Sequence, residues 1–199
     1  LPVLLRMLAV GQTHELVVDR LASSINVPAR SLPAYLDVLE RLYLLHLLPP
    51  WSTNLTKRET GRHRIQLTDS GMVFHLLGLA SARLAPGVEP DYAGPILEGF
   101  AVEQLRRQAW WAQQEIRLFG YRTYDQREID VVVETADGRV GAVEVKASSA
   151  VGEKDFRHLR WFAEKLGKRF AGGVLLHTGK TAAPFGPKLA ALPFSALWV

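Results

Sequence analysis

The chain has 199 residues, 48% of them hydrophobic and 22% charged, and its formal net charge is +4. This composition is typical of a packed globular protein, and the length suits one large or two small domains. The net charge is too small to indicate nucleic-acid binding by itself, and the absence of cysteine excludes disulfides and cysteine-ligated zinc. No apolar run approaches the roughly 20 residues of a membrane-spanning helix, and no signal peptide is evident. We therefore expect a cytoplasmic protein without a membrane partner.

The first part of the chain has the apolar spacing of three short helices. They are expected over residues 2–10, 16–25 and 31–43, with Ser31 as the N-cap of the third. The third helix carries an apolar stripe made of Leu32, Tyr35, Leu36, Leu39 and Leu42. Two helices across a tight turn, the second amphipathic, predict a helix-turn-helix. Because the first residue is Leu1 rather than methionine, we expect the chain to be a piece of a longer protein.

Two apolar segments, residues 44–48 and 65–67, flank a polar loop and predict a small hairpin. A helix-turn-helix followed by such a hairpin is a winged helix. The loop holds a group of basic residues, namely Lys57, Arg58, Arg62 and Arg64. They would contact phosphates if the loop is a DNA-binding wing. The alternative is a solvated loop, which is favoured because the third helix is not basic.

A linker is predicted between the two halves of the chain. Residues 70–79 indicate a short apolar helix, and residues 85–94 contain two prolines and two glycines, which are typical of connections. Beyond this point the pattern changes from short helices to helices alternating with strands. We therefore predict two domains, residues 1–90 and residues 91–199.

The second half has the order α-β-β-β-α-β, an α/β pattern in a chain that is α+β overall. Helices are expected over residues 96–111 and 154–170, and strands over 115–124, 129–134, 140–145 and 173–177, with a last strand over 194–198. The second helix has an inner stripe of Phe156, Leu159, Phe162, Ala163 and Leu166. His177, at the end of a strand, is expected to be structural rather than catalytic.

The segment EIDVVVETADGRVGAVEVK, residues 128–146, contains two valine-rich strands joined by a turn. Alternation places Asp130 with Val132 and Glu134 on one face of the first strand, and Glu144 with Ala142 and Lys146 on one face of the second. Ile129, Val131, Val133, Val143 and Val145 then point the other way, into a core.

The length of the turn decides whether the two acids meet. A two-residue loop at Asp137-Gly138 would pair Val131 with Glu144, on opposite faces. A three-residue loop over residues 136–138 pairs Thr135 with Arg139 and Asp130 with Glu144. Such loops commonly carry a glycine in the left-handed region, and Gly138 stands at that position. We therefore predict the three-residue loop.

Two neighbouring carboxylates repel each other and are costly to desolvate, and a divalent cation removes this repulsion. Mg²⁺ binds through one or two carboxylates and keeps water and substrate phosphate oxygens as its other ligands. Lys146, on the same face, could position a water molecule or offset charge that builds on a phosphate. The alternative is an exposed hairpin face that carries a Glu–Lys pair.

Asp130 followed by Glu144-Val145-Lys146, with a helix before and a helix and strand after, resembles the PD-(D/E)xK nuclease superfamily. The resemblance covers roughly residues 94–199, although Ile129 stands where the motif has proline. It implies a restriction-endonuclease-like fold, an Mg²⁺ or Mn²⁺ ion held by Asp130, Glu144 and the backbone carbonyl of Val145, and Lys146 as a catalytic residue. It also implies a glutamate from the first helix, for which Glu98 matches better than Glu103. Glu98 also has a structural explanation, since a helix dipole favours acids in its first turn. Arg157 and Arg160 could contact the phosphate.

Longer segments resemble a more specific group. YLDVLERLYLLHLLPPW, IQLTDSGMVFHLLGL, GPILEGFAVEQL and REIDVVVETADGRVGAVEVKAS are similar to the C-terminal region of a prokaryotic family of AAA+-type ATP-binding proteins. In that family an ATPase core precedes a winged helix and a nuclease-like domain of unknown function. This chain has no G-x-x-x-x-G-K-[ST] loop, so we expect no ATP hydrolysis here and an ATPase core before Leu1.

Three functions remain open on the sequence. The first is a metal-dependent nuclease acting on DNA, with Asp130, Glu144, Lys146 and Glu98 at its site. The second is a catalytically silent module in which the nuclease fold and winged helix contact protein or DNA for the ATPase. The third is a DNA-binding regulator that uses only the winged helix, and the weak basic character argues against it. The sequence predicts no oligomeric state.

Overall fold

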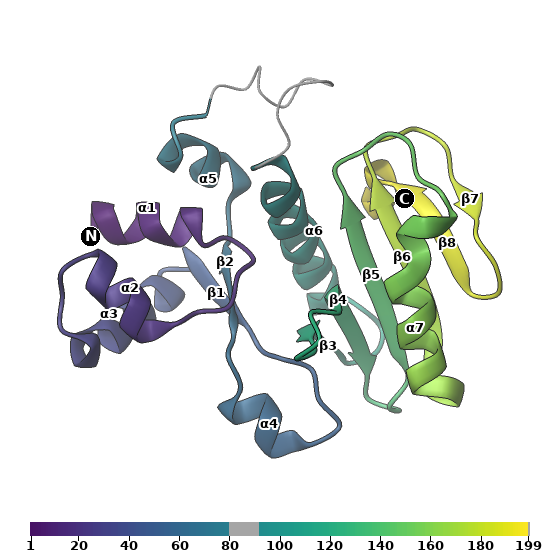
Figure 1. The fold of residues 1–199 in the computed structure, drawn as a ribbon, viewed down its shortest axis with the longest axis horizontal. Coiled ribbons are helices and arrows are strands. Elements are labelled where there is room, and N and C mark those ends of the chain that lie inside the picture. The colour runs from purple at the N-terminus through teal and green to yellow at the C-terminus, as the bar shows by residue number, and fades with distance from the viewer. Residues whose placement is uncertain (80–91, 199) are drawn as a thin grey trace.

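The structure is a computed structural model that describes residues 1–79 and 92–198, and it combines helices with two β-sheets (Figure 1). This confirms the mixed α+β class. We call residues 1–79 the N-terminal module and residues 92–198 the C-terminal module. Most of the predicted linker, residues 85–91, lies outside the described residues, so the division into two domains remains a prediction.

The N-terminal module consists of short helices around a two-stranded sheet. Its elements are α1 (Pro2–Val10), α2 (Val18–Ser24), α3 (Leu32–Arg41), β1 (Leu45–Leu48), α4 (Leu55–Thr60), β2 (Arg64–Leu67) and α5 (Ser70–Leu76). β1 and β2 pair antiparallel, as predicted. The helix α4 was not predicted. It begins where the Asn54 side chain accepts a hydrogen bond from the Lys57 N–H, a capping interaction that allows a short helix inside a polar loop.

The core of the N-terminal module is built from one face each of α1, α2, α3 and α5, while α4 contributes no buried residue. Leu8, Leu32, Leu39 and Val73 are fully buried there. The predicted stripe of α3 is correct for its leucines at positions 32, 36 and 39, but Tyr35 is 49% exposed and Leu42 58%. These two residues belong to the outer face of the helix, where no described element covers them.

The C-terminal module is a six-stranded mixed sheet with helices on both faces. Its elements are α6 (Ala93–Trp110), β3 (Ile116–Arg122), β4 (Glu128–Thr135), β5 (Val140–Lys146), α7 (Arg157–Leu166), β6 (Phe170–His177), β7 (Ala183–Pro184) and β8 (Leu189–Pro193). The strand order is β3-β4-β5-β6-β8-β7, with β5, β6 and β8 parallel. The predicted order α-β-β-β-α-β is confirmed from α6 to β6. None of the helices in the two described stretches is long and apolar enough to cross a membrane.

The prediction of a last strand over residues 194–198 is wrong. Phe194–Trp198 is a 3₁₀ helix, and the strand is β8, just before it. β8 was missed because alanines fill its middle and alanine is depleted in strands, whereas the aromatic residues that follow are typical of strands. Tertiary packing decides instead, since Leu189 and Ala191 are buried in the core under α7.

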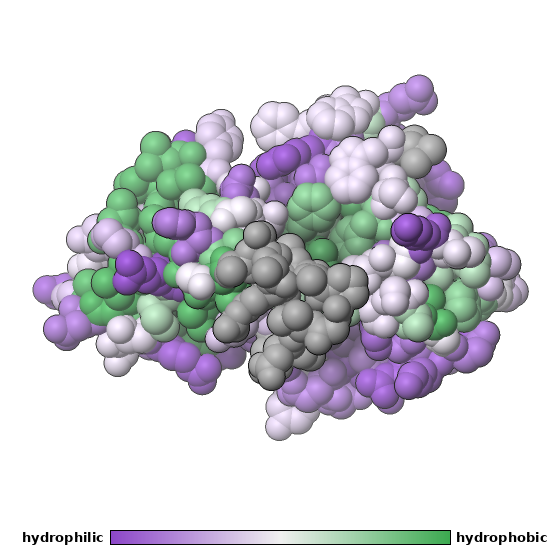
Figure 2. All heavy atoms as spheres, turned by 90° about the horizontal axis from the view of Figure 1, so that it is seen from above, coloured by the Kyte–Doolittle hydropathy of each residue, from purple (hydrophilic) through white to green (hydrophobic). Residues whose placement is uncertain are grey.

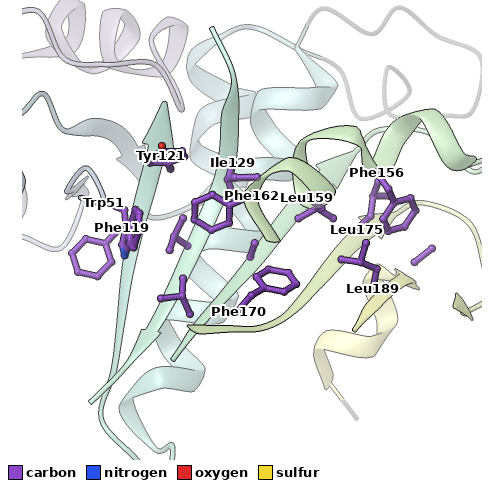
Figure 3. Packing of buried hydrophobic residues seen from close by; sticks show 14 residues of the cluster. Trp51, Phe119, Tyr121, Ile129, Phe156, Leu159, Phe162, Phe170, Leu175 and Leu189 are labelled. Carbon is purple, nitrogen blue, oxygen red and sulfur yellow. The ribbon is translucent and has the colours of Figure 1, made fainter. Parts of the chain in front are cut away.

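Two apolar layers hold the sheet between α6 and α7 (Figure 1). On the α7 face, Phe156, Leu159 and Phe162 are fully buried, as the predicted stripe requires (Figure 3). On the α6 face, Ala101 and Val102 pack with valines of β4 and β5. Burial of this kind contributes about 1.5–3 kcal/mol for each large side chain, so the ends of β4 and β5 rest on a rigid support.

The hairpin of β4 and β5 has the predicted register. Val131 pairs with Val143 and Val132 with Ala142. The Thr135 N–H donates to the Arg139 carbonyl at 3.0 Å, and Gly138 has a φ of +80°, as the three-residue loop requires. Continued by two residues, this register sets Asp130 opposite Glu144.

The predicted alternation fails at one point, because β4 contains a β-bulge. On the β3 side, Phe119 pairs with Val132 and Tyr121 with Ile129, so Asp130 and Val131 both stand opposite the single residue Gly120. As a result, Ile129 packs on the α7 face together with Val132, and not with Val131 as predicted. Strict alternation, from which the face of Asp130 was predicted, therefore does not hold at this residue.

Gly120 is also where the N-terminal module joins the sheet. Its N–H donates to the Pro49 carbonyl at 2.9 Å, and its carbonyl accepts from the Trp51 N–H at 2.7 Å. Trp51 is buried against Tyr121 and Phe162, with ring centroids 5.6 and 5.5 Å apart in edge-to-face geometry (Figure 3). The two modules thus share backbone hydrogen bonds and a buried tryptophan next to the bulge.

Candidate functional site

Asp130 lies in the bulge of β4 and is 8% exposed. Its Oδ2 atom accepts a hydrogen bond from the backbone N–H of Val145 at 2.7 Å. The side chain therefore reaches across to β5 at the residue that follows Glu144. Burial raises the pKa of Asp130 to about 6, against the opposing effect of this hydrogen bond.

Glu144, on β5, is partly buried, with a side chain that is 16% exposed. Its Oε1 atom is inaccessible to solvent and has no hydrogen-bond partner within the described residues. On α7, the Nδ1 atom of His158 lies 3.9 Å from this oxygen, too far for a hydrogen bond. Burial, followed by the negative charge of Asp130, raises the pKa of Glu144 well above its ordinary value.

The helix α6 brings Glu98, rather than Glu103, to this region. Burial and then the Asp130 carboxylate raise the pKa of Glu98 well above its ordinary value. Glu103 is 2% exposed and forms a bidentate ion pair with Arg106, at 2.8 to 3.1 Å. The charge of Glu103 is balanced within α6, so Glu98 is the better candidate of the two for a residue of the site.

Glu128 is a fourth acid of the same region. It lies two residues before Asp130, and its negative charge raises the pKa values of Asp130, Glu144 and Glu98. We call these four residues, Glu98, Glu128, Asp130 and Glu144, the carboxylate cluster. Glu128 was not predicted, although period-two alternation at the start of the strand sets it on the side of Asp130.

Arg64 supplies the positive charge inside the carboxylate cluster. It comes from β2 of the N-terminal module, and its side chain is only 6% exposed. Its guanidinium lies 3.3 Å from Glu98 and 3.5 Å from Glu128, and it donates to the Tyr121 carbonyl at 3.1 Å. Sequence reasoning placed Arg64 on a basic wing. No local pattern reports that its side chain is buried against another module.

Lys146 lines a cavity of about 300 Å³ beside Glu144. Its Nζ lies 2.6 Å from Asp155 Oδ1, and this pair lowers the pKa of Asp155. The cavity is also lined by Lys154, Arg157 and His158. Lys146 is therefore next to Glu144, as predicted, but it is held by an acid that the sequence analysis did not select.

Asp130 and Glu144 are the candidate ligands of a divalent metal ion. Within residues 1–79 and 92–198, no three His, Asp or Glu side chains are close enough together to hold an ion by themselves. Asp130 and Glu144 fit a site with two carboxylates, since they are neighbours, repel each other, and leave Glu144 Oε1 without a partner. The Val145 N–H is part of this arrangement, while its carbonyl as a ligand remains a prediction.

The predicted nucleic-acid contacts divide into two groups. Lys57, Arg62 and Arg157 are exposed. The other three contact groups of the protein itself. Arg58 pairs with Glu134, Arg64 pairs with the carboxylate cluster, and Arg160 donates to the Glu153 carbonyl. Since Glu134 is at the turn end of β4, α4 lies at the opposite end of the hairpin from Glu144 (Figure 1). Among these six predicted contacts, only Arg157 lines the cavity that contains Glu144 and Lys146.

Two family models match the chain, one for each module. The model of a domain of unknown function, DUF4143, matches residues 93–197, and that of a second domain of unknown function, DUF8612, matches residues 1–83. Neither description states an activity.

Similar curated proteins come from mycobacteria. The chain is 35% identical over 129 residues to "Uncharacterized protein Rv2008c" of Mycobacterium tuberculosis and, to the same extent, to "Uncharacterized protein Mb2031c" of Mycobacterium bovis. The alignment covers 65% of this chain and 28% of each relative, so the relatives are much longer than the region they share with it. No solved structure matches the chain significantly.

Proposed function

We propose that this chain, which belongs to the family of the domain of unknown function DUF4143, catalyses the metal-dependent hydrolysis of phosphodiester bonds in DNA. The observation that supports this proposal most is the excess of negative charge at the end of the hairpin. Four acids lie there beside Arg64 and Arg122. Within residues 1–79 and 92–198, the Oε1 atom of Glu144 is buried without a hydrogen-bond partner. Strongly perturbed carboxylates next to a cavity are typical of functional sites.

In this proposal Asp130 and Glu144 hold an Mg²⁺ or Mn²⁺ ion, with the Val145 carbonyl as a further ligand and Glu98 assisting. The ion would supply Lewis acidity and make a bound water more acidic. The chain's own residues do the rest. Arg157 and Lys154, both exposed at the cavity, bind the phosphodiester. Lys146 orients the attacking water and donates to the phosphate oxygen as charge builds there.

The finer assignment of the fold belongs to the same proposal. The order from α6 to β6 is that of the PD-(D/E)xK core, and α2, α3 and the β1–β2 hairpin have the order of a winged helix. Together with the resemblance to AAA+-type proteins, this leads us to propose that an ATPase core delivers the DNA in the cytoplasm. The sequence given contains no G-x-x-x-x-G-K-[ST] loop, so we expect no ATP hydrolysis by this chain.

A second candidate function is a silent scaffold that contacts a partner protein. It is favoured by the ion pairs of Arg64 and Lys146, which engage cluster and cavity residues without a metal. The outer face of α3 supports it as well, since this face is apolar and not basic. Its exposed residues are Tyr35, Val38, Leu42 and, just beyond the helix, Tyr43. Figure 2 shows hydrophobic side chains gathered over the N-terminal helices, at the left of the view.

A DNA cleavage assay with Mn²⁺ tests the first candidate. The wild type is compared with Asp130→Ala on linear and supercoiled DNA. Glu115→Ala is the matched control, because Glu115 is an exposed acid whose side chain pairs with the exposed Arg117. Cleavage by the wild type and the control, lost in Asp130→Ala, is the expected result. Equal products in all three proteins would exclude Asp130 from catalysis. No cleavage, together with no effect of Mn²⁺ on thermal stability, would favour the silent scaffold.

A further inference from the structure

We propose that Arg64 is a built-in cation that competes with the divalent metal, so that the N-terminal module controls metal entry to the carboxylate cluster. The inference rests on the proposed function, because it assigns a regulator to the same site. Arg64 belongs to β2, and every acid of the cluster belongs to the C-terminal module. Docking of the N-terminal module therefore adds a positive charge to the site.

The contacts of Arg64 are those expected of a buried cation that takes the place of a metal ion, and differ from those of a surface ion pair. The guanidinium lies between Glu98 and Glu128, at 3.3 and 3.5 Å, and it also lies 3.5 Å from the carbonyl of Asp130. These oxygens come from α6 and β4, so a single group links both elements. A side chain that is 6% exposed is shielded from water and salt, so its charge acts strongly on the neighbouring acids.

The sheet has a slot shaped for this side chain. A Cβ atom added to Gly120 would lie 2.9 Å from both Cδ and Nε of Arg64. Only glycine at this position lets the arginine pass so close to β3. The slot lies opposite the bulge that contains Asp130. Asp130 and Arg64 are therefore both positioned at this bulge, Asp130 within it and Arg64 against the glycine opposite it.

Arg64 does not satisfy the whole cluster. Two arginines, Arg64 and the more exposed Arg122 beside Glu128, face four acids. Glu144 Oε1 keeps no partner in the described part of the chain. A divalent ion at Asp130 and Glu144 carries more charge and reaches the acid that Arg64 does not contact. The two cations repel each other across this small region, so each is expected to weaken the binding of the other.

The competition makes metal binding and module docking reciprocal. A metal ion that binds at Asp130 and Glu144 weakens the hold of the cluster on Arg64, and a partner or DNA that draws β2 away opens the cluster to metal. Other junctions, such as the hydrogen bonds of Gly120 with Pro49 and Trp51, hold the modules together while the arginine moves.

Calorimetric titration of Mn²⁺ into wild type, Arg64→Gln and Arg62→Gln tests the inference. Arg62 is the matched control, since it lies two residues before Arg64 but is 65% exposed and pairs with Glu15, at 3.7 Å. Arg64→Gln should bind Mn²⁺ about tenfold more tightly, within the roughly 5–150-fold range of coupled sites. Arg62→Gln should bind like wild type. Arg64→Lys, which keeps the charge without the fork, should fall between wild type and Arg64→Gln, and it serves as the test if Arg64→Gln does not fold.

Cleavage of DNA is measured on the same proteins, which separates the two claims. Equal Mn²⁺ affinity in wild type and the Arg64 variants would overturn the competition, even if wild type cleaves DNA. Tighter binding in the Arg64 variants without any cleavage would support the competition and count against the nuclease. Absence of Mn²⁺ binding in all variants would overturn both.

Discussion

The strand β4 carries an acid near each end, and the two acids have opposite surroundings. Glu134, at the turn end, accepts two hydrogen bonds from Arg58 and one each from Arg169 and Trp51. These partners lower its pKa. At the other end, Arg64 contacts the backbone carbonyl of Asp130 and pairs with Glu98 and Glu128 instead of the Asp130 carboxylate, and the pKa of Asp130 is raised. Asp130 is buried and Glu134 partly buried, and each lies near an arginine from the N-terminal module.

The difference is one of charge balance. At Glu134 two arginines surround one carboxylate, which gives a satisfied pair that stabilises the junction of the modules. At Asp130 four carboxylates are faced by Arg64 and, beside Glu128, by Arg122, and this leaves repulsion that folding alone does not explain. The comparison indicates that Glu134 is a structural acid and Asp130 a functional one.

Glu134→Ala should have the largest effect on stability. The change leaves Arg58, whose side chain is 11% exposed, buried without its partner. Loss of one member of a buried pair costs about 3 kcal/mol in the free energy of unfolding. Urea denaturation measures this, with the exposed Glu115→Ala as control, where the cost should stay below about 0.5 kcal/mol. Equal effects of the two changes would remove the structural role of Glu134.

Asp130→Asn should have the opposite sign. The amide can still accept the Val145 N–H, while the repulsion with Glu144 and Glu98 is removed. Without metal at pH 8, we expect a gain of about 1–2 kcal/mol, because one pKa unit corresponds to about 1.4 kcal/mol. Urea denaturation in the presence of a chelator measures it. A clear loss of stability would mean that Asp130 is held as tightly as Glu134.

The gain from Asp130→Asn should depend on pH. Because the native pKa is raised to about 6, the native state holds this proton more tightly than the unfolded chain. The contribution of Asp130 to stability is present in full below its unfolded pKa, near ~3.9, and is lost as the pH rises through about 6. The advantage of the variant should therefore shrink between pH 8 and pH 4. An advantage that stays constant over this range would contradict the raised pKa.

Lys146→Ala should change stability least. Its ion pair with Asp155 is partly exposed on the lysine side, at 44%, and Asp155 keeps a hydrogen bond from the Gly152 N–H. The cost should be within about 1 kcal/mol. Cleavage should fall much more than Mn²⁺ affinity, because the lysine acts on water and phosphate. Lys168→Ala is the control, because Lys168 is an exposed lysine that does not line the cavity. A parallel loss of metal affinity would assign Lys146 to ion binding.

The sequence was sufficient wherever local rules decide the structure. Apolar spacing predicted α1 and the inner face of α7, and Gly138 predicted the loop that sets the register of β4 and β5. Asp130 and Glu144 could be paired for this reason alone. Such features depend on neighbouring residues and on turn geometry, which a single sequence contains.

The remainder depends on contacts between distant segments. The bulge at Asp130 reflects the docking of Pro49 and Trp51 on Gly120, and no pattern within β4 indicates it. The position of Arg64 depends on the same docking. β8 was missed because burial, and not propensity, makes its alanines a strand. His158 became a neighbour of Glu144 only through the packing of α7.

The central claim is that the unbalanced cluster at Asp130 binds a divalent ion. Titration of Mn²⁺ into wild type and Asp130→Asn, followed by calorimetry at pH 8, tests it most directly. The account predicts one saturable site in wild type and an affinity at least about tenfold weaker in the variant, since the lost charge removes one of two carboxylate ligands. Equal affinity in both proteins, or no saturable binding by wild type, would contradict it.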